Sequence, residues 1–170
     1  IEYTDWKVIQ SDVSSDWNTV SFDDSTWNTY KAVDIPSTSS ITTYIRKSFT
    51  MSGVNDYQVL NVRVKYSGGV AAYLNGNLVA RFNLEDDFDS LSLSITDHDA
   101  SVFSKFHVIL STSGIQEGTN VFSFEIHRPL SGSSSDPVVF DATGVFGVED
   151  CSTVVDSYSS LTSTTPTSGT

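Results

Sequence analysis

The strongest constraint on the fold of this chain is a regular alternation of apolar and polar side chains along short stretches of sequence. In residues 59–66 apolar positions alternate with Arg63 and Lys65, and residues 121–127 alternate in the same way. Successive side chains of a β-strand point to opposite faces of a sheet, so this period of two predicts strands that are buried on one face. Helical periodicity is nearly absent, and the pattern is typical of antiparallel sheets.

Turn residues separate these strands and indicate their order. Asn75-Gly76 supplies the pair of positive φ angles that a tight type I′ turn requires. Together with a turn at Ser67-Gly68-Gly69, it predicts a three-stranded meander over residues 59–83. Further strands are predicted at residues 44–49, 106–110, 121–127 and 138–148. We therefore expect an all-β fold, an antiparallel β-sandwich or jelly roll of about eight strands.

Composition indicates one folded domain followed by a tail. Leu, Ile, Val and Phe make up 47 of the 170 residues, which is enough for a hydrophobic core. We place the β-sandwich domain at residues 1–150, a length typical of one domain. Residues 151–170 are mostly Ser and Thr, which predicts a linker or tail. Cys151 is the only cysteine, so no disulfide can form within the chain.

The charge of the chain excludes several classes of partner. It has 21 acidic and nine basic side chains, a net charge of −12. Binding of nucleic acid needs a basic footprint, and an anionic membrane repels an acidic protein, so neither partner is expected. No apolar run is long enough to span a bilayer, and we expect no membrane insertion. Neutral sugars, cations and basic protein surfaces remain possible partners.

An ordered set of motifs resembles the galactose-binding-like β-sandwich modules that are attached to many glycosidases and extracellular proteins. The matching pieces span residues 22–27, 44–49, 67–76, 79–83, 118–127 and 135–141. The resemblance implies a jelly-roll fold, an extracellular or cell-surface location, and a packing role for Trp27. One departure is the turn before the hairpin, where Tyr66-Ser67-Gly68-Gly69 replaces the family's Asp-Asp-Gly.

We therefore expect a non-catalytic carbohydrate-binding module of a larger extracellular or cell-surface protein, with a glycan or neighbouring domains as partners. The alternative is a structural module that self-assembles in a filament or surface coat through protein–protein contacts. We do not expect an enzyme, because the chain has no nucleophile elbow, zinc-binding His-Glu helix or phosphate-binding glycine loop. Glu125 and His127 lie two residues apart on one strand face, which favours a hydrogen-bonded pair over an acid/base couple.

Two parts of the sequence are candidates for sugar binding, which combines flat aromatic faces with polar groups that match hydroxyls. Trp17 is surrounded by polar residues, and we expect it to be partly exposed. The long unassigned segment 85–105 is the other candidate, since long irregular loops are often functional. Its polar candidates are Asp86, Asp87, Asp89, Asp97 and His98. The alternative for this segment is a solvated acidic loop.

A structural calcium ion is a further expectation. Hard cations bind several oxygen ligands, and Asp side chains are the usual source. The resemblance implies a calcium site between an N-terminal loop and the last strand, which would join Asp23 or Asp24 to Asp141. The alternative is that Asp23-Asp24-Ser25 forms a turn that needs no metal.

Overall fold

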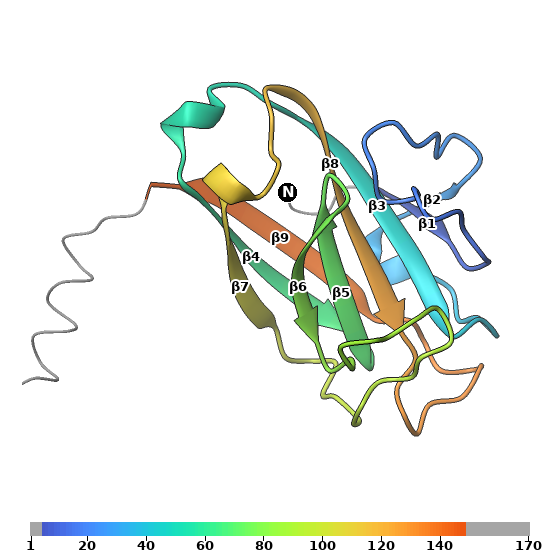
Figure 1. The fold of residues 1–170 in the computed structure, drawn as a ribbon. Coiled ribbons are helices and arrows are strands. Elements are labelled where there is room, and N and C mark those ends of the chain that lie inside the picture. The colour runs from blue at the N-terminus through green and yellow to red at the C-terminus, as the bar shows by residue number, and fades with distance from the viewer. Residues whose placement is uncertain (1–4, 149–170) are drawn as a thin grey trace, which may run out of the picture.

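The computed structural model describes residues 5–148, and within them nine strands form two antiparallel sheets (Figure 1). The strands are β1 (Trp6–Ile9), β2 (Asn28–Tyr30), β3 (Thr42–Met51), β4 (Val59–Tyr66), β5 (Gly69–Leu74), β6 (Asn77–Phe82), β7 (Ser104–Ile109), β8 (Gly118–His127) and β9 (Phe140–Gly147). The larger sheet has the order β2-β1-β3-β8-β5-β6, and the smaller sheet has the order β7-β4-β9. The predicted all-β antiparallel sandwich is confirmed.

The main hydrophobic core fills the space between the two sheets. Three aromatic rings lie at its centre, with Trp6 and Phe140 5.1 Å apart and Phe124 and Phe140 5.0 Å apart between ring centroids. Both pairs are in edge-to-face geometry, which aromatic quadrupoles favour. The alternation read from residues 59–66 and 121–127 holds, because the apolar residues of β4 and β8 point into this core.

The predicted three-stranded meander over residues 59–83 is wrong. β4 pairs with β7 and β9 in the smaller sheet, whereas β5 pairs with β6 and β8 in the larger one. Ser67-Gly68-Gly69 is therefore a crossing between sheets rather than a hairpin turn. Gly68 has a φ of 91°, and a Cβ there would lie 2.4 Å from the carbonyl oxygen of His127. The close approach of the two backbones at this crossing requires glycine.

The hairpin between β5 and β6 is confirmed. Asn75 has a φ of 50° and Gly76 a φ of 87°, so both turn residues are in the positive-φ region that the sequence predicted. The Asn75 side chain also accepts a hydrogen bond from the N–H of Val121 at 2.8 Å. The turn is thereby joined to β8, the strand beside β5.

Three features complete the fold and lead to the functional surfaces. Residues 10–27 lie against the outer face of the larger sheet, through a second hydrophobic cluster around Trp17, Trp27 and Tyr44. The loop 83–103 and the loop 128–139 lie at one end of the sandwich (Figure 1). The only helices in the described part of the chain are short 3₁₀ turns at Ala32–Asp34, Val54–Asp56 and Leu110–Thr112, and none could cross a membrane. The predicted tail, residues 151–170, lies outside the described residues.

Candidate functional site

The loop 83–103 uses several of its acidic side chains to hold its own turns. The Asp89 carboxylate accepts hydrogen bonds from the N–H of Leu91 at 2.9 Å and the hydroxyl of Ser92 at 3.0 Å. The Asp99 carboxylate accepts from the N–H and the hydroxyl of Ser101 in the same way. These hydrogen bonds favour the ionised carboxylates and lower the pKa of both Asp89 and Asp99.

The other predicted residues of this loop point to different neighbours. The Asp97 carboxylate accepts from the N–H of Ser131 at 2.9 Å and from its hydroxyl at 2.7 Å, and so joins the two loops at this end. Asp86 forms an ion pair with Arg81, and Asp87 is exposed. The structure does not bring these carboxylates together at one site.

His98 packs onto the sandwich and does not face solvent with the acids. Its ring is stacked on Tyr66 with centroids 4.2 Å apart and an interplanar angle of 2°. Its Nε2 atom is buried and has no hydrogen-bond partner among the described residues. This histidine therefore anchors the loop by stacking on the side chain at the end of β4.

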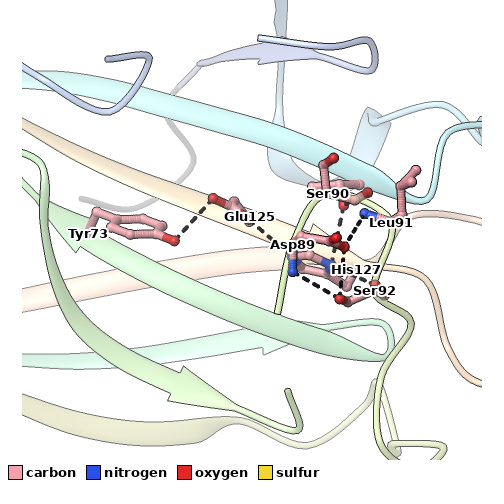
Figure 2. A network of polar contacts seen from close by, with 8 residues as sticks. Tyr73, Asp89, Ser90, Leu91, Ser92, Glu125 and His127 are labelled. Atoms are coloured by element: carbon pink, nitrogen blue, oxygen red, sulfur yellow. Dashed lines mark hydrogen bonds and ion pairs between the residues drawn. The ribbon is translucent and has the colours of Figure 1, made fainter. Parts of the chain in front are cut away.

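A buried polar network ties the same loop to the outer face of the larger sheet (Figure 2). The Tyr73 hydroxyl donates to Glu125 Oε1 at 3.1 Å, and Glu125 Oε2 lies 3.1 Å from His127 Nε2. His127 Nδ1 lies 2.8 Å from the carbonyl oxygen of Ser92. The predicted hydrogen-bonded pair of Glu125 and His127 is confirmed.

The hydrogen bonds of this network show which atoms carry protons, and they indicate that the network is structural. The Ser92 carbonyl can only accept, so His127 Nδ1 must carry a hydrogen. The bond between His127 Nε2 and Glu125 Oε2 then shares one further proton. Both ring nitrogens are engaged and the imidazole is fully buried, so it offers no free base to a substrate. Burial and the nearby Glu125 raise the pKa of Tyr44 to about 12 and also raise that of Tyr73, so both phenols stay neutral.

Trp17 is buried, and the expectation of a partly exposed ring is wrong. Only 5% of its surface is exposed. Its ring contacts Tyr44 with centroids 4.9 Å apart and Tyr73 with centroids 5.7 Å apart. The polar neighbours in the sequence lie in turns that fold the ring inward, with the Trp17 N–H donating to the Ser14 carbonyl. Trp27, which the resemblance placed in packing, is buried beside it.

The three carboxylates of the expected calcium site do not converge. Asp24 accepts from Arg46, whose side chain lies on the outer face of the larger sheet, and Asp23 accepts from the N–H of Ser25. Asp141 lies on β9 between two core residues, so it faces outward from the smaller sheet on the opposite side of the sandwich. In residues 5–148 no group of three His, Cys, Asp or Glu side chains is placed to hold a metal. Calcium binding stays a prediction, which a melting scan with calcium and with a chelator tests.

A large hollow lies elsewhere, on the outer face of β7, β4 and β9. It has a volume of about 850 Å³ and is open to solvent. Because the apolar residues of β4 face the core, the alternate side chains face outward into this hollow. The polar side chains that line it are Asn61, Arg63, Lys105, His107 and Thr143.

Strand register sets the positions of these groups. Arg63 lies opposite Lys105 on one side and Thr143 on the other, and its Nε donates to the Thr143 hydroxyl at 2.7 Å. Asn61 lies opposite His107 in the next outward-facing row. The face thus offers an amide, an imidazole, a hydroxyl and cations on three adjacent strands. We call the outward-facing residues Asn61, Arg63, Lys65, Phe103, Lys105, His107, Asp141 and Thr143 the β4 face.

Phe103 and Lys65 extend the β4 face beyond the hollow. The Lys65 ammonium lies 4.6 Å from the centroid of the Phe103 ring, and the Arg63 guanidinium lies 4.9 Å from it. Sequence reasoning recognised that Arg63 and Lys65 share the polar side of one strand but did not treat them as a site. The usable signal was that β4 and β7 both alternate cationic, amide or imidazole side chains with apolar ones in an otherwise acidic chain.

Comparison with known proteins identifies the fold. A β-glucuronidase from Bacteroides uniformis superposes with a TM-score of 0.53 at 14% identity, over 85% of this chain and 17% of its own. A glycosyl hydrolase family 2 member from Bacteroides cellulosilyticus gives 0.51 at 16% identity, over 85% of this chain and 20% of its own. A glycoside hydrolase family 2 β-glucuronidase gives 0.47 at 18% identity, over 74% of this chain and 13% of its own.

These similarities concern a part of each enzyme. The chain spans 20% or less of the length of each of the three glycosidases. At such low identity the likeness to the two Bacteroides enzymes defines the fold alone. It is a β-sandwich of the kind found in glycoside hydrolase family 2 enzymes, which confirms the predicted resemblance to glycosidase-associated sandwich modules at the level of the fold. No protein-family model matches the sequence, and no curated protein sequence matches it.

Proposed function

We propose that this chain is a non-catalytic carbohydrate-binding module of a larger protein, and that it binds sugar on the β4 face. The observation that carries the proposal is the open hollow of about 850 Å³ lined by hydrogen-bonding side chains from three adjacent strands. Sugar hydroxyls both donate and accept hydrogen bonds, and Asn61, His107 and Thr143 together offer donors and acceptors.

The other candidate sites are less suited to ligand binding, because their side chains are buried or engaged within the fold. Trp17 is covered, and the Glu125–His127 pair is buried with its hydrogen-bonding capacity used internally. The acids of the loop 83–103 mainly hold turns and the neighbouring loop. The β4 face is instead built on rigid strands and open to solvent, which suits binding of an extended ligand without rearrangement.

A glycan array followed by calorimetry tests the proposal. Asn61→Ala should weaken binding of any array hit about fivefold or more, because it removes one or two hydrogen bonds. Asn28→Ala, at an exposed position on β2 in the other sheet, is the matched control and should leave affinity unchanged. Backbone amide signals of β7, β4 and β9 should shift on titration. A hit that binds both variants equally and shifts other strands would contradict the site.

The structural-module alternative predicts a different result. If the array gives no hit and sedimentation shows concentration-dependent self-association, assembly replaces sugar binding as the function. The proposed extracellular or cell-surface location is consistent with binding of polysaccharide. It is tested by fractionation of cells that express the full parent protein.

A further inference from the structure

We propose that the β4 face selects acidic glycans, and that its cations bind the carboxylate or sulfate groups of the sugar chain. The inference rests on the proposed function and adds the chemical class of the ligand. Its first support is charge distribution. The chain has only nine Lys and Arg residues against 21 acids, yet Arg63, Lys65 and Lys105 all lie on this one face.

The register places two of these cations side by side. Arg63 and Lys105 occupy directly opposite positions on β4 and β7. Like charges at such positions destabilise a sheet, and opposite charges stabilise it. A chain with an excess of Asp and Glu could readily place an acid opposite Arg63. Violations of this kind are kept where function requires them or where another group offsets the repulsion, as Asp24 does beside the opposed Lys7 and Arg46 of the larger sheet.

Cationic side chains outnumber acidic ones on the face. Among the outward-facing residues of these three strands, the three cations are accompanied by Asp141, which lies opposite Lys65 at one corner. His107 adds a further donor beside Lys105 on β7. Screening confines the effect of the distant acidic surface to about 8 Å at physiological ionic strength, so acids elsewhere on the protein add little at the face.

Phe103 gives the cationic end of the face a sugar-stacking platform. Lys65 and Arg63 both lie within 5 Å of the centroid of its ring, and the electron-rich ring face stabilises their charge. The aromatic ring can also pack against the apolar side of a pyranose. Cations, neutral hydrogen-bonding groups and one aromatic ring on one face match a sugar that carries one acid group per unit.

This composition favours an acidic glycan over nucleic acid. Double-stranded DNA carries one charge per about 1.7 Å of axis, and its binding needs many phosphate contacts from a basic surface. Three cations interspersed with Asn61, Thr143 and His107 form a sparse pattern in a chain whose net charge is −12. A carboxylated polysaccharide has fewer charges and more hydroxyls for its length, which fits that pattern.

Calorimetry with matched probes tests the inference. The probes are an oligogalacturonide, its methyl ester, a sulfated galactan oligosaccharide and a single-stranded DNA oligomer. Tight binding of the oligogalacturonide with binding of its ester at least about tenfold weaker supports carboxylate recognition. Preference for the sulfated probe supports the same cationic face with sulfate as the source of the anion. Equal affinity for the acid and its ester, with both weakened by Asn61→Ala, overturns the inference and leaves the proposed function intact.

The remaining outcomes are also decisive. No binding of any glycan in either charge form refutes the proposed function and the inference together. Binding of the DNA oligomer as tightly as the oligogalacturonide overturns the inference, because the face would then be a general polyanion surface.

A charge reversal separates a binding role from a structural one. Lys105→Glu places an acid opposite Arg63, and we expect it to raise Tm by about 1–3 °C while it abolishes binding of the acidic probe. Lys7→Ala, on the outer face of the other sheet, should change neither binding nor the preference for acid over ester. Unchanged affinity in Lys105→Glu would overturn the inference, whatever the shift in Tm.

Discussion

The Arg46 guanidinium and the Asp24 carboxylate form an ion pair across the outer face of the larger sheet, with Nε and Oδ2 2.9 Å apart. The Arg46 side chain is only 1% exposed. Its other nitrogens donate to the carbonyl oxygens of Trp17, Thr19 and Phe22. One arginine from β3 thus fixes the whole segment that covers this face, and the covering segment supplies the opposing charge.

Removal of the charge partner should destabilise the fold. Asp24→Ala leaves a buried guanidinium without its carboxylate, and we expect a loss of about 2–4 kcal/mol in the free energy of unfolding. Asp23→Ala removes only an exposed cap on the N–H of Ser25 and should cost clearly less. Urea denaturation of the two variants makes the comparison. Equal losses would mean that the ion pair does not hold the segment.

Truncation of Trp17 should also be costly. Trp17→Ala removes a buried ring from the cluster with Trp27 and Tyr44, and we expect a loss of about 3–5 kcal/mol in the free energy of unfolding. Val33→Ala, at a position that is 81% exposed, is the control and should stay within about 0.5 kcal/mol of the native chain. Near-native stability of Trp17→Ala would contradict the burial of this ring and make Trp17 a candidate for surface binding again.

The crossing at residues 67–69 shows which part of the fold the sequence could not predict. The period of two located β4 and β8 correctly because alternation is a local property of a half-buried strand. The partner of β4 is not a local property. Glycines at 68 and 69 fit a hairpin turn, but the chain changes sheets there because β4 pairs with β7 and β9, which are distant in sequence.

For the candidate surfaces, too, local properties could be predicted from the sequence and contacts between distant segments could not. The polar neighbours of Trp17 suggested exposure, whereas its ring is buried against Tyr44 and Tyr73 of two strands. The outward direction of Arg63 and Lys65 was readable from the sequence alone. The hollow was not, because it exists only where three separated strands lie side by side.

The buried Glu125–His127 pair should tolerate an amide but not a truncation. In Glu125→Gln the side-chain amide can donate to a neutral His127 Nε2, while its carbonyl accepts from Tyr73. We expect a loss below about 1 kcal/mol in the free energy of unfolding for this variant, because every buried polar group keeps a partner. Glu125→Ala leaves the His127 imidazole and the Tyr73 hydroxyl without a hydrogen-bond partner at this position. It should lower the free energy of unfolding by about 2–4 kcal/mol.

Hydrogen exchange provides the second readout for this pair. Since His127 holds the Ser92 carbonyl, Glu125→Ala should also speed amide exchange in residues 88–92, whereas Glu125→Gln should not. Equal effects of both variants on stability and exchange would show that charge, rather than hydrogen bonding, holds the network.

Acid should loosen the contact between the two loops at the end of the sandwich. Hydrogen bonds from Ser131 hold the pKa of Asp97 below its ordinary value of 3.8. A carboxyl whose pKa is lower in the folded state stabilises the fold at pH values above 3.8. That contribution is lost as the pH falls through the lowered pKa. The N–H signal of Ser131 in an NMR titration should therefore move with a midpoint below 3.8, and its protection factor against amide exchange should fall at lower pH.

The Asp97→Asn variant isolates this contribution from the other acids of the loop. It removes the titrating group, so the Ser131 signal should no longer respond to acid. The Leu91 signal, which reports on Asp89, should still titrate with a midpoint below 3.8 because hydrogen bonds from Leu91 and Ser92 also lower the pKa of Asp89. A Ser131 midpoint at or above 3.8 in the native chain would mean that the two loops are not joined through Asp97 in solution.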